Sequence, residues 1–159
     1  MANTVDFSYT SVMTLSHKAD GHRHLAIPIF YETGNNSNFA VDFILDTGAY
    51  LTVLTKMTAE LFGFDKLEPL VKKVPLTGFA GFKVEGDLIE IPMLFGGKRI
   101  DAKVAVPYVD TMNDILGLNV LEHFNYLIDN SNDKIYFSDN AVYKANHNLM
   151  CSRVWSVST

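Results

Sequence analysis

The stretch that decides the fold lies at residues 41–49 and reads Val41-Asp42-Phe43-Ile44-Leu45-Asp46-Thr47-Gly48-Ala49. An apolar segment typical of a buried strand runs directly into Asp46-Thr47-Gly48. A carboxylate at the end of a buried strand is costly unless hydrogen-bond donors hold it or a function uses it. Glycine permits a tight turn that brings backbone N–H groups toward the carboxylate, and the threonine hydroxyl can make a buried hydrogen bond. Taken alone, the tripeptide is better explained as an ordinary turn, because Asp and Gly are common in turns, so its surroundings must decide.

Around this stretch the apolar residues recur with a period of two, which is typical of half-buried β-strands. Three pairs of such segments, each separated by turn-forming residues, predict β-hairpins. The pairs are residues 25–31 with 39–45, residues 89–95 with 100–106, and residues 126–128 with 135–137. The tightest connection is Gly96-Gly97, which joins the second pair.

Two short segments carry the signals of helices. Residues 56–62 follow Thr55, a good N-cap, and precede Gly63, which can take the left-handed conformation that ends a helix. Residues 118–124 place apolar side chains near one face at spacings of three. Many short strands with one or two short helices predict an all-β fold with a curled or barrel-like sheet.

Composition narrows the functional classes. The chain has 159 residues, 48% of them hydrophobic and 19% charged, as in one domain with its own core. A formal net charge of −5 with scattered Lys and Arg argues against a nucleic-acid partner. Cys151 is the single cysteine and no apolar run could cross a membrane, so we expect a cytoplasmic protein without a membrane partner. His22 and His24 have no third or fourth ligand beside them in the sequence, so we expect no metal site.

Four motifs in a fixed order resemble the retropepsin-like aspartic proteases. They are the apolar strand with Asp-Thr-Gly-Ala at 41–49, the helix ending at Leu61-Phe62-Gly63, the glycine-containing segment Leu76–Phe82, and Ile115-Leu116-Gly117 followed by residues 118–121. The resemblance covers roughly residues 25–137, and residues 57–64 look more like the cellular and bacterial-type members than the retroviral enzymes. So does Leu118-Asn119. The resemblance implies a retropepsin-like acid protease barrel.

It also implies an aspartic endopeptidase that acts on peptides or proteins without a cofactor. Two carboxylates across a shared water cannot both ionise easily, so one stays protonated while the other accepts a proton from the attacking water. The sequence has one such motif, Asp46-Thr47-Gly48, so the resemblance implies a homodimer with Asp46 from each chain at the two-fold axis. Thr47 would join the two loops across the axis. Ile115-Leu116-Gly117 would pack behind them as structural support.

The candidate flap, which would bind substrate, is Gly78-Phe79-Ala80-Gly81-Phe82. Glycines let a hairpin tip bend, and the aromatic rings could cover a bound peptide and exclude water. A plain glycine hairpin whose phenylalanines pack on the core is the structural alternative.

The expected organisation is an N-terminal arm or adapter strand at residues 1–23, a retropepsin-like domain at 24–139 and a C-terminal tail at 140–159. Two other interpretations fit the same residues. A catalytically weak or inactive retropepsin fold could serve as a dimerisation or peptide-binding module, because catalysis depends on the distance between two Asp46 carboxylates. A monomeric β-barrel with a chance Asp-Thr-Gly would require the ordered motifs to be accidental.

Overall fold

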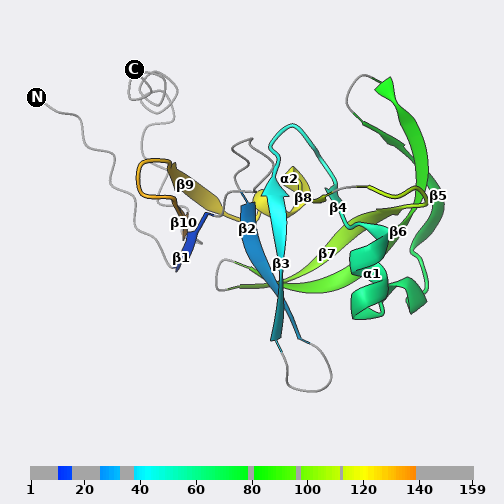
Figure 1. Ribbon diagram of the computed structural model, residues 1–159, viewed down its shortest axis with the longest axis horizontal. Helices are drawn as coiled ribbons and strands as arrows, with labels where there is room; N and C mark the ends of the chain where they lie inside the picture. Colours follow the sequence, from blue (N-terminus) through cyan, green and yellow to red (C-terminus); the bar gives the residue numbers. More distant parts are fainter. Residues whose placement is uncertain are drawn as a thin grey trace, which may run out of the picture.

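The structure is a computed structural model that describes residues 11–15, 26–32, 38–78, 81–95, 98–111 and 113–138. Within these residues the chain forms two β-sheets, two short α-helices and one 3₁₀ turn (Figure 1). The expectations for Phe79, Ala80, Cys151 and the tail at 140–159 lie outside the described residues. The predicted all-β fold is confirmed.

The larger sheet has seven strands in the order β2-β3-β8-β4-β7-β6-β5. Their bounds are β2 Ala26–Glu32, β3 Asn38–Leu45, β4 Thr52–Val53, β5 Val71–Thr77, β6 Lys83–Phe95, β7 Lys98–Pro107 and β8 Asp114–Leu116. The predicted hairpins β2–β3 and β6–β7 are both present and antiparallel, whereas β3–β8 and β4–β7 are parallel. A further pairing of Phe30 in β2 with Leu94 in β6 closes the sheet on itself, as expected for a barrel-like fold.

The smaller sheet has three antiparallel strands in the order β1-β10-β9. Its strands are β1 Ser11–Thr14, β9 Asn125–Asp129 and β10 Lys134–Ser138. The hairpin of β9 and β10 was predicted, and β1 comes from the segment expected to be an arm or adapter strand. Figure 1 shows this sheet at the opposite end of the molecule from β5. The division of the chain into arm, domain and tail stays a prediction.

Helix α1 spans Lys56–Phe62, as its capping residues predict. The Thr55 hydroxyl accepts a hydrogen bond from the backbone N–H of Thr58, and Gly63 ends the helix with φ 73°. The 3₁₀ turn η1, Phe64–Lys66, follows directly. Among the described residues no helix is both long and apolar enough to cross a bilayer.

Helix α2 spans Leu118–Leu121 and is shorter than the 118–124 segment predicted from the sequence. Beyond Leu121 the backbone tightens, because the N–H groups of His123 and Phe124 each bond to the carbonyl three residues earlier. Such bonds form a tight turn rather than a further turn of α-helix. Phe124 is nevertheless buried, so the apolar spacing identified a core contact and overestimated the helix.

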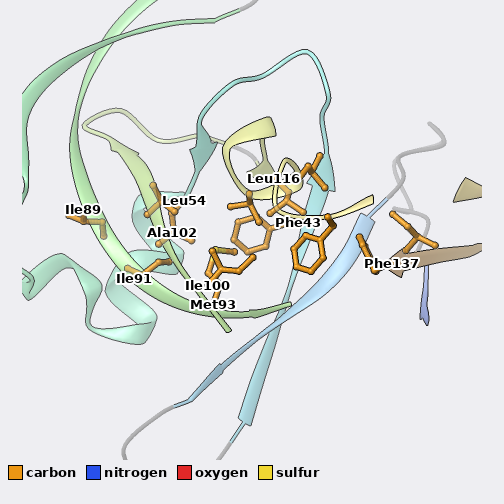
Figure 2. Close-up of a cluster of buried hydrophobic side chains, with 14 of the residues drawn as sticks. Phe43, Leu54, Ile89, Ile91, Met93, Ile100, Ala102, Leu116 and Phe137 are labelled. Atoms are coloured by element: carbon orange, nitrogen blue, oxygen red, sulfur yellow. The ribbon is translucent and has the colours of Figure 1, made fainter. Parts of the chain in front are cut away.

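The core lies inside the curled sheet and continues to the smaller sheet. Alternate residues of β6 and β7 point inward, among them Ile89, Ile91 and Ala102, and they pack with residues from β3, β8 and β10 (Figure 2). The ring of Phe124 meets that of Phe137 edge-on at 5.4 Å between centroids. One continuous core therefore holds the smaller sheet against the barrel.

The turn between β9 and β10 is organised by one carboxylate. Oδ1 of Asp129 accepts the backbone N–H groups of Ser131 and Asn132 at 3.1 and 3.2 Å, and Oδ2 accepts the Asn132 side-chain amide at 2.7 Å. The amide of Asn132, aided by these two N–H groups, lowers the pKa of Asp129 below its usual 3.8. The charged carboxylate is therefore the form that the folded turn stabilises.

We expect Asp129→Asn to lower the melting temperature at pH 7 and to cost progressively less in acid. Because folding lowers the pKa of Asp129, its stabilisation is fully present above pH 3.8 and is lost as the pH falls through the folded value. Thermal unfolding of both proteins between pH 7 and pH 2 checks this. Asp110→Asn, at an exposed residue, is the control. A melting-temperature difference that stays constant down to the lowest pH would show that the charge plays no part.

Candidate active site

Asp46 stands where β3 ends, and its loop is held by hydrogen bonds. Its backbone N–H donates to the carbonyl of Leu116 at 3.1 Å, and its Oδ1 accepts the N–H of Gly48 at 2.8 Å. The carboxylate is half-buried, whereas Thr47 and Gly48 are exposed. The turn expected from the tripeptide, with a backbone N–H aimed at the carboxylate, is therefore present.

The support predicted for this loop lies directly beside it. Strand β8 pairs with β3 in parallel, with Leu116 opposite Leu45, so Ile115-Leu116-Gly117 runs alongside the strand that ends at Asp46. The N–H groups of Leu118 and Asn119 then donate to the carbonyls of Ala49 and Tyr50, each at 2.9 Å. The start of α2 thus fixes the chain that follows Asp46.

Gly117 permits this close approach. A Cβ at this position would lie 2.6 Å from the carbonyl carbon of Leu51 and 2.7 Å from the carbonyl oxygens of Tyr50 and Leu51. Real Cβ atoms essentially never come so near to backbone. The glycine of the Ile-Leu-Gly motif is therefore required by the close approach of the backbone. Its backbone angle does not require glycine, since a φ of −94° is open to any residue.

A polar brace that was not predicted from the sequence joins the start of α2 to strands β4 and β7 behind the loop. Asn119 accepts hydrogen bonds at Oδ1 from the N–H and hydroxyl of Thr52, at 2.8 and 2.9 Å, and donates from Nδ2 to the carbonyl of Lys103 at 2.7 Å. The Thr52 hydroxyl also accepts the N–H of Gly117 at 3.0 Å. Thr52 is fully buried, so these bonds satisfy its polar atoms. The signal in the sequence was a lone threonine within the apolar run Leu51–Leu54.

Asp114 has a structural role distinct from that of Asp46. It is 7% exposed, and its two oxygens accept the backbone N–H of Thr55 at 2.7 Å and the hydroxyl of Thr58 at 2.8 Å. Both oxygens are thus occupied in joining β8 to the start of α1. Among the described residues, no hydrogen bond connects Asp46 to a second carboxylate or the Thr47 hydroxyl to any group.

The candidate flap is the end of the β5–β6 hairpin, which extends from the body of the molecule (Figure 1). The N–H of Gly78 donates to the carbonyl of Phe82 at 2.8 Å, and Gly81 has φ 77°, a conformation that favours glycine. Phe82 is 76% exposed, so it does not pack on the core. Phe79 and Ala80 lie outside the described residues.

Comparison with solved structures shows which known fold this arrangement matches. The structure matches a retropepsin-like aspartic protease from Rickettsia conorii with TM-score 0.56 and 26% identity, over 79% of this chain and 98% of that one. The chain has the fold of the retropepsin-like aspartic proteases. The fold is also that of the retroviral protease-like domain of Ddi1 from Leishmania major, with TM-score 0.51 and 22% identity over 75% and 98% of the two chains. No family model and no curated protein sequence matches this chain.

We expect Gly117→Ala to destabilise this retropepsin-like chain by about 1–3 kcal/mol, the usual cost of overpacking. The new methyl group meets backbone of the chain that follows Asp46, which must move. Gly78→Ala is the matched control, because its nearest contact would be an ordinary 3.8 Å. Urea unfolding of both variants measures the two costs. Equal stability of Gly117→Ala and wild type would show that the close approach is not required.

Proposed function

We propose that this chain is an aspartic endopeptidase whose active site forms from Asp46 of two copies. The observation that carries the proposal is the Asp46 loop: a half-exposed carboxylate at the end of a strand, held by the Gly48 N–H, in a fold shared with an aspartic protease at 26% identity. The substrate class is an extended peptide or protein segment. The single Cys151 supports a reducing cytosol as its compartment.

The chemistry follows from two carboxylates that share one proton. Like charges held close together cannot both ionise, so one Asp46 is protonated and its partner is a carboxylate. The carboxylate takes a proton from a water as the water attacks the peptide carbonyl carbon, while the protonated Asp46 donates to the carbonyl oxygen. Proton transfer to the amide nitrogen then allows the C–N bond to break. No cofactor takes part in these steps.

Three features support the two-fold arrangement. The sequence holds one Asp-Thr-Gly, and the chain folds as one barrel with that motif at a strand end. The Thr47 side chain is exposed and bonds to no described residue, which leaves its hydroxyl available to a second copy. A symmetric pair would therefore complete the dyad and use the free hydroxyl.

The remaining site residues have assigned roles. Gly48 provides the N–H that orients the Asp46 carboxylate, and Ile115-Leu116-Gly117 holds the loop from behind. The flap, Gly78-Phe79-Ala80-Gly81-Phe82, would close over the substrate. The 76% exposure of Phe82 supports this role, because an exposed aromatic ring can gain contacts only when something binds.

Asp46→Asn tests the shared dyad. The change is nearly isosteric, so dimers and peptide binding should persist, while hydrolysis falls by about 10²–10⁴ because an amide cannot accept the proton from water. A four-fold excess of Asp46→Asn chains, after full exchange, leaves only about one fifth of wild-type chains with a wild-type partner. Activity per wild-type chain should fall by the same factor.

The matched control is an equal excess of Asp110→Asn chains, which should leave activity per chain unchanged. Unchanged activity with Asp46→Asn chains, after exchange is verified by mass spectrometry, would rule out a site shared between two copies. Wild type that binds peptides and never cleaves them across acidic and neutral pH would instead establish the peptide-binding module.

Thr47→Val tests the contact across the axis. The variant keeps the volume and removes the hydroxyl, which leaves any buried partner group unsatisfied at about 1–3 kcal/mol. We expect dimer dissociation to become at least about ten-fold easier, with a parallel loss of activity. Thr47→Ser keeps the hydroxyl and should remain close to wild type. Sedimentation that gives Thr47→Val the dimer affinity of wild type would refute the role of the hydroxyl.

A further inference from the structure

A cavity of about 350 Å³ lies away from Asp46, between α1, η1 and the strands β6 and β7. Its lining includes neither the Asp46 loop nor the flap. Figure 1 shows α1 at the lower right of the molecule, whereas the loop after β3 turns higher up and to the left of it. The volume is at the lower end of the range of about 300–1,000 Å³ that is common for ligand pockets.

The floor of this cavity is apolar. Ala59 and Ile89 are 0% and 3% exposed, and half-buried Phe64 and Val106 complete the floor with the buried Pro107. Apolar walls of this kind favour a hydrophobic side chain over water, because burying apolar surface is the main favourable term in association.

The rim of the cavity is acidic. Glu60, Asp65 and Asp87 carry three carboxylates against the single ammonium group of Lys56. Lys56 and Glu60 are one helical turn apart, yet no ion pair within 4.0 Å joins them or the other rim carboxylates to a described cation. The residues that line the cavity therefore carry a net negative charge, which attracts a cation.

Asp87 is held in place at this rim. Its Oδ1 accepts the hydroxyl of Tyr108 and, at 3.4 Å, the backbone N–H of Lys73. The hydrogen bond to Asp87 raises the pKa of the Tyr108 hydroxyl, which therefore stays protonated and continues to donate. No bond to the second oxygen of Asp87 is present among the described residues.

Exposed apolar residues continue from the cavity along the chain. Leu67, which lines it, is 41% exposed, and Leu70 and Val71 at the start of β5 are 52% and 51% exposed. Large apolar side chains this exposed and this close in sequence are typical of a contact surface. A peptide segment longer than one residue could use both the cavity and this surface.

We propose that this cavity is a docking site for a peptide segment in which a basic side chain stands next to a bulky apolar one. The apolar side chain fills the floor over Ala59 and Ile89, and the cation meets Glu60, Asp65 and Asp87. The segment belongs to the protein substrate and lies outside the cleaved bond. This role rests on the proposed protease function, whereas the binding itself does not.

Binding is measured on the catalytically disabled Asp46→Asn chain by two-dimensional ¹H–¹⁵N NMR. The probes are acetyl-Gly-Leu-Arg-Leu-Gly-amide and the same peptide with Gln in place of Arg. We expect the Arg peptide to shift the amide signals of Ala59, Phe64 and Ile89 and the Gln peptide to bind several-fold more weakly. Equal binding of both peptides, or no shift at these residues, would overturn the proposal.

A double variant, Glu60→Gln with Asp65→Asn, tests the rim. Both side chains are exposed, so the fold should tolerate the change, and we expect about five-fold weaker binding of the Arg peptide at low salt. Glu122→Gln with Asp101→Asn removes two exposed carboxylates outside the cavity and should leave binding unchanged. Equal losses in the two double variants would mean that only net charge matters and would refute a docking site.

Kinetics then separate docking from catalysis. A peptide that wild type cleaves is compared with the same peptide extended by a Gly-Ser linker and Leu-Arg-Leu. We expect the extension to lower KM about five-fold with kcat unchanged, and the rim variant to remove this gain. Binding at the cavity with no cleavage of any peptide would refute the protease and keep the docking site. Cleavage with the same KM for both peptides would refute the docking role and keep the protease.

Discussion

The parallel pairing of β3 with β8 is the constraint on which the site depends. It places Leu116 beside Leu45, so that the next residue on one strand is Asp46 and the next on the other is Gly117. Parallel strands cannot be joined by a short turn, and here about seventy residues separate them in sequence. The whole β4–β7 segment, including the flap hairpin, is the connection that this pairing requires. The geometry of the Asp46 loop is thus a property of the complete barrel.

Buried polar groups make that pairing specific. Thr52 and Asn119 satisfy one another between β4 and the start of α2, and Asp114 anchors the start of α1 to β8. Apolar packing alone tolerates small shifts of one strand against another, whereas a displaced hydrogen-bond network leaves buried atoms unpaired at substantial cost. These two braces therefore define where the loop after β3 sits, although none of their atoms faces the substrate in the proposed mechanism.

Helix caps and the alternation of apolar residues predicted the elements that are determined by residues close together in sequence. Both predicted bounds of α1 were correct, because Thr55 directly precedes the helix and Gly63 directly follows it. The β6–β7 hairpin was predicted correctly because its alternation is long and regular. The end of α2 was wrong, since a tight turn after Leu121 has the same apolar spacing as a helix. The brace of Thr52 and Asn119 joins residues 67 positions apart, which no periodic pattern reveals. The strand β1 is only four residues long and gains its order from β10.

The closure of the barrel has a mechanical consequence. Among the described residues, strand β2 pairs with β6 at one register position, Phe30 with Leu94, whereas β6 and β7 are paired continuously from Gly86 to Phe95. The β2–β6 contact that closes the barrel is therefore narrow. Separating β2 from β6 breaks far fewer backbone hydrogen bonds than separating β6 from β7. Strands β2 and β3, with Asp46 at the end of β3, lie on one side of this contact, and the hairpin of β5 and β6 lies on the other. Strand β4 also meets β8 at one register position, Val53 with Ile115, and the bond from Asn119 to the carbonyl of Lys103 supports that side, so the position of Asp46 relative to the hairpin depends on both contacts.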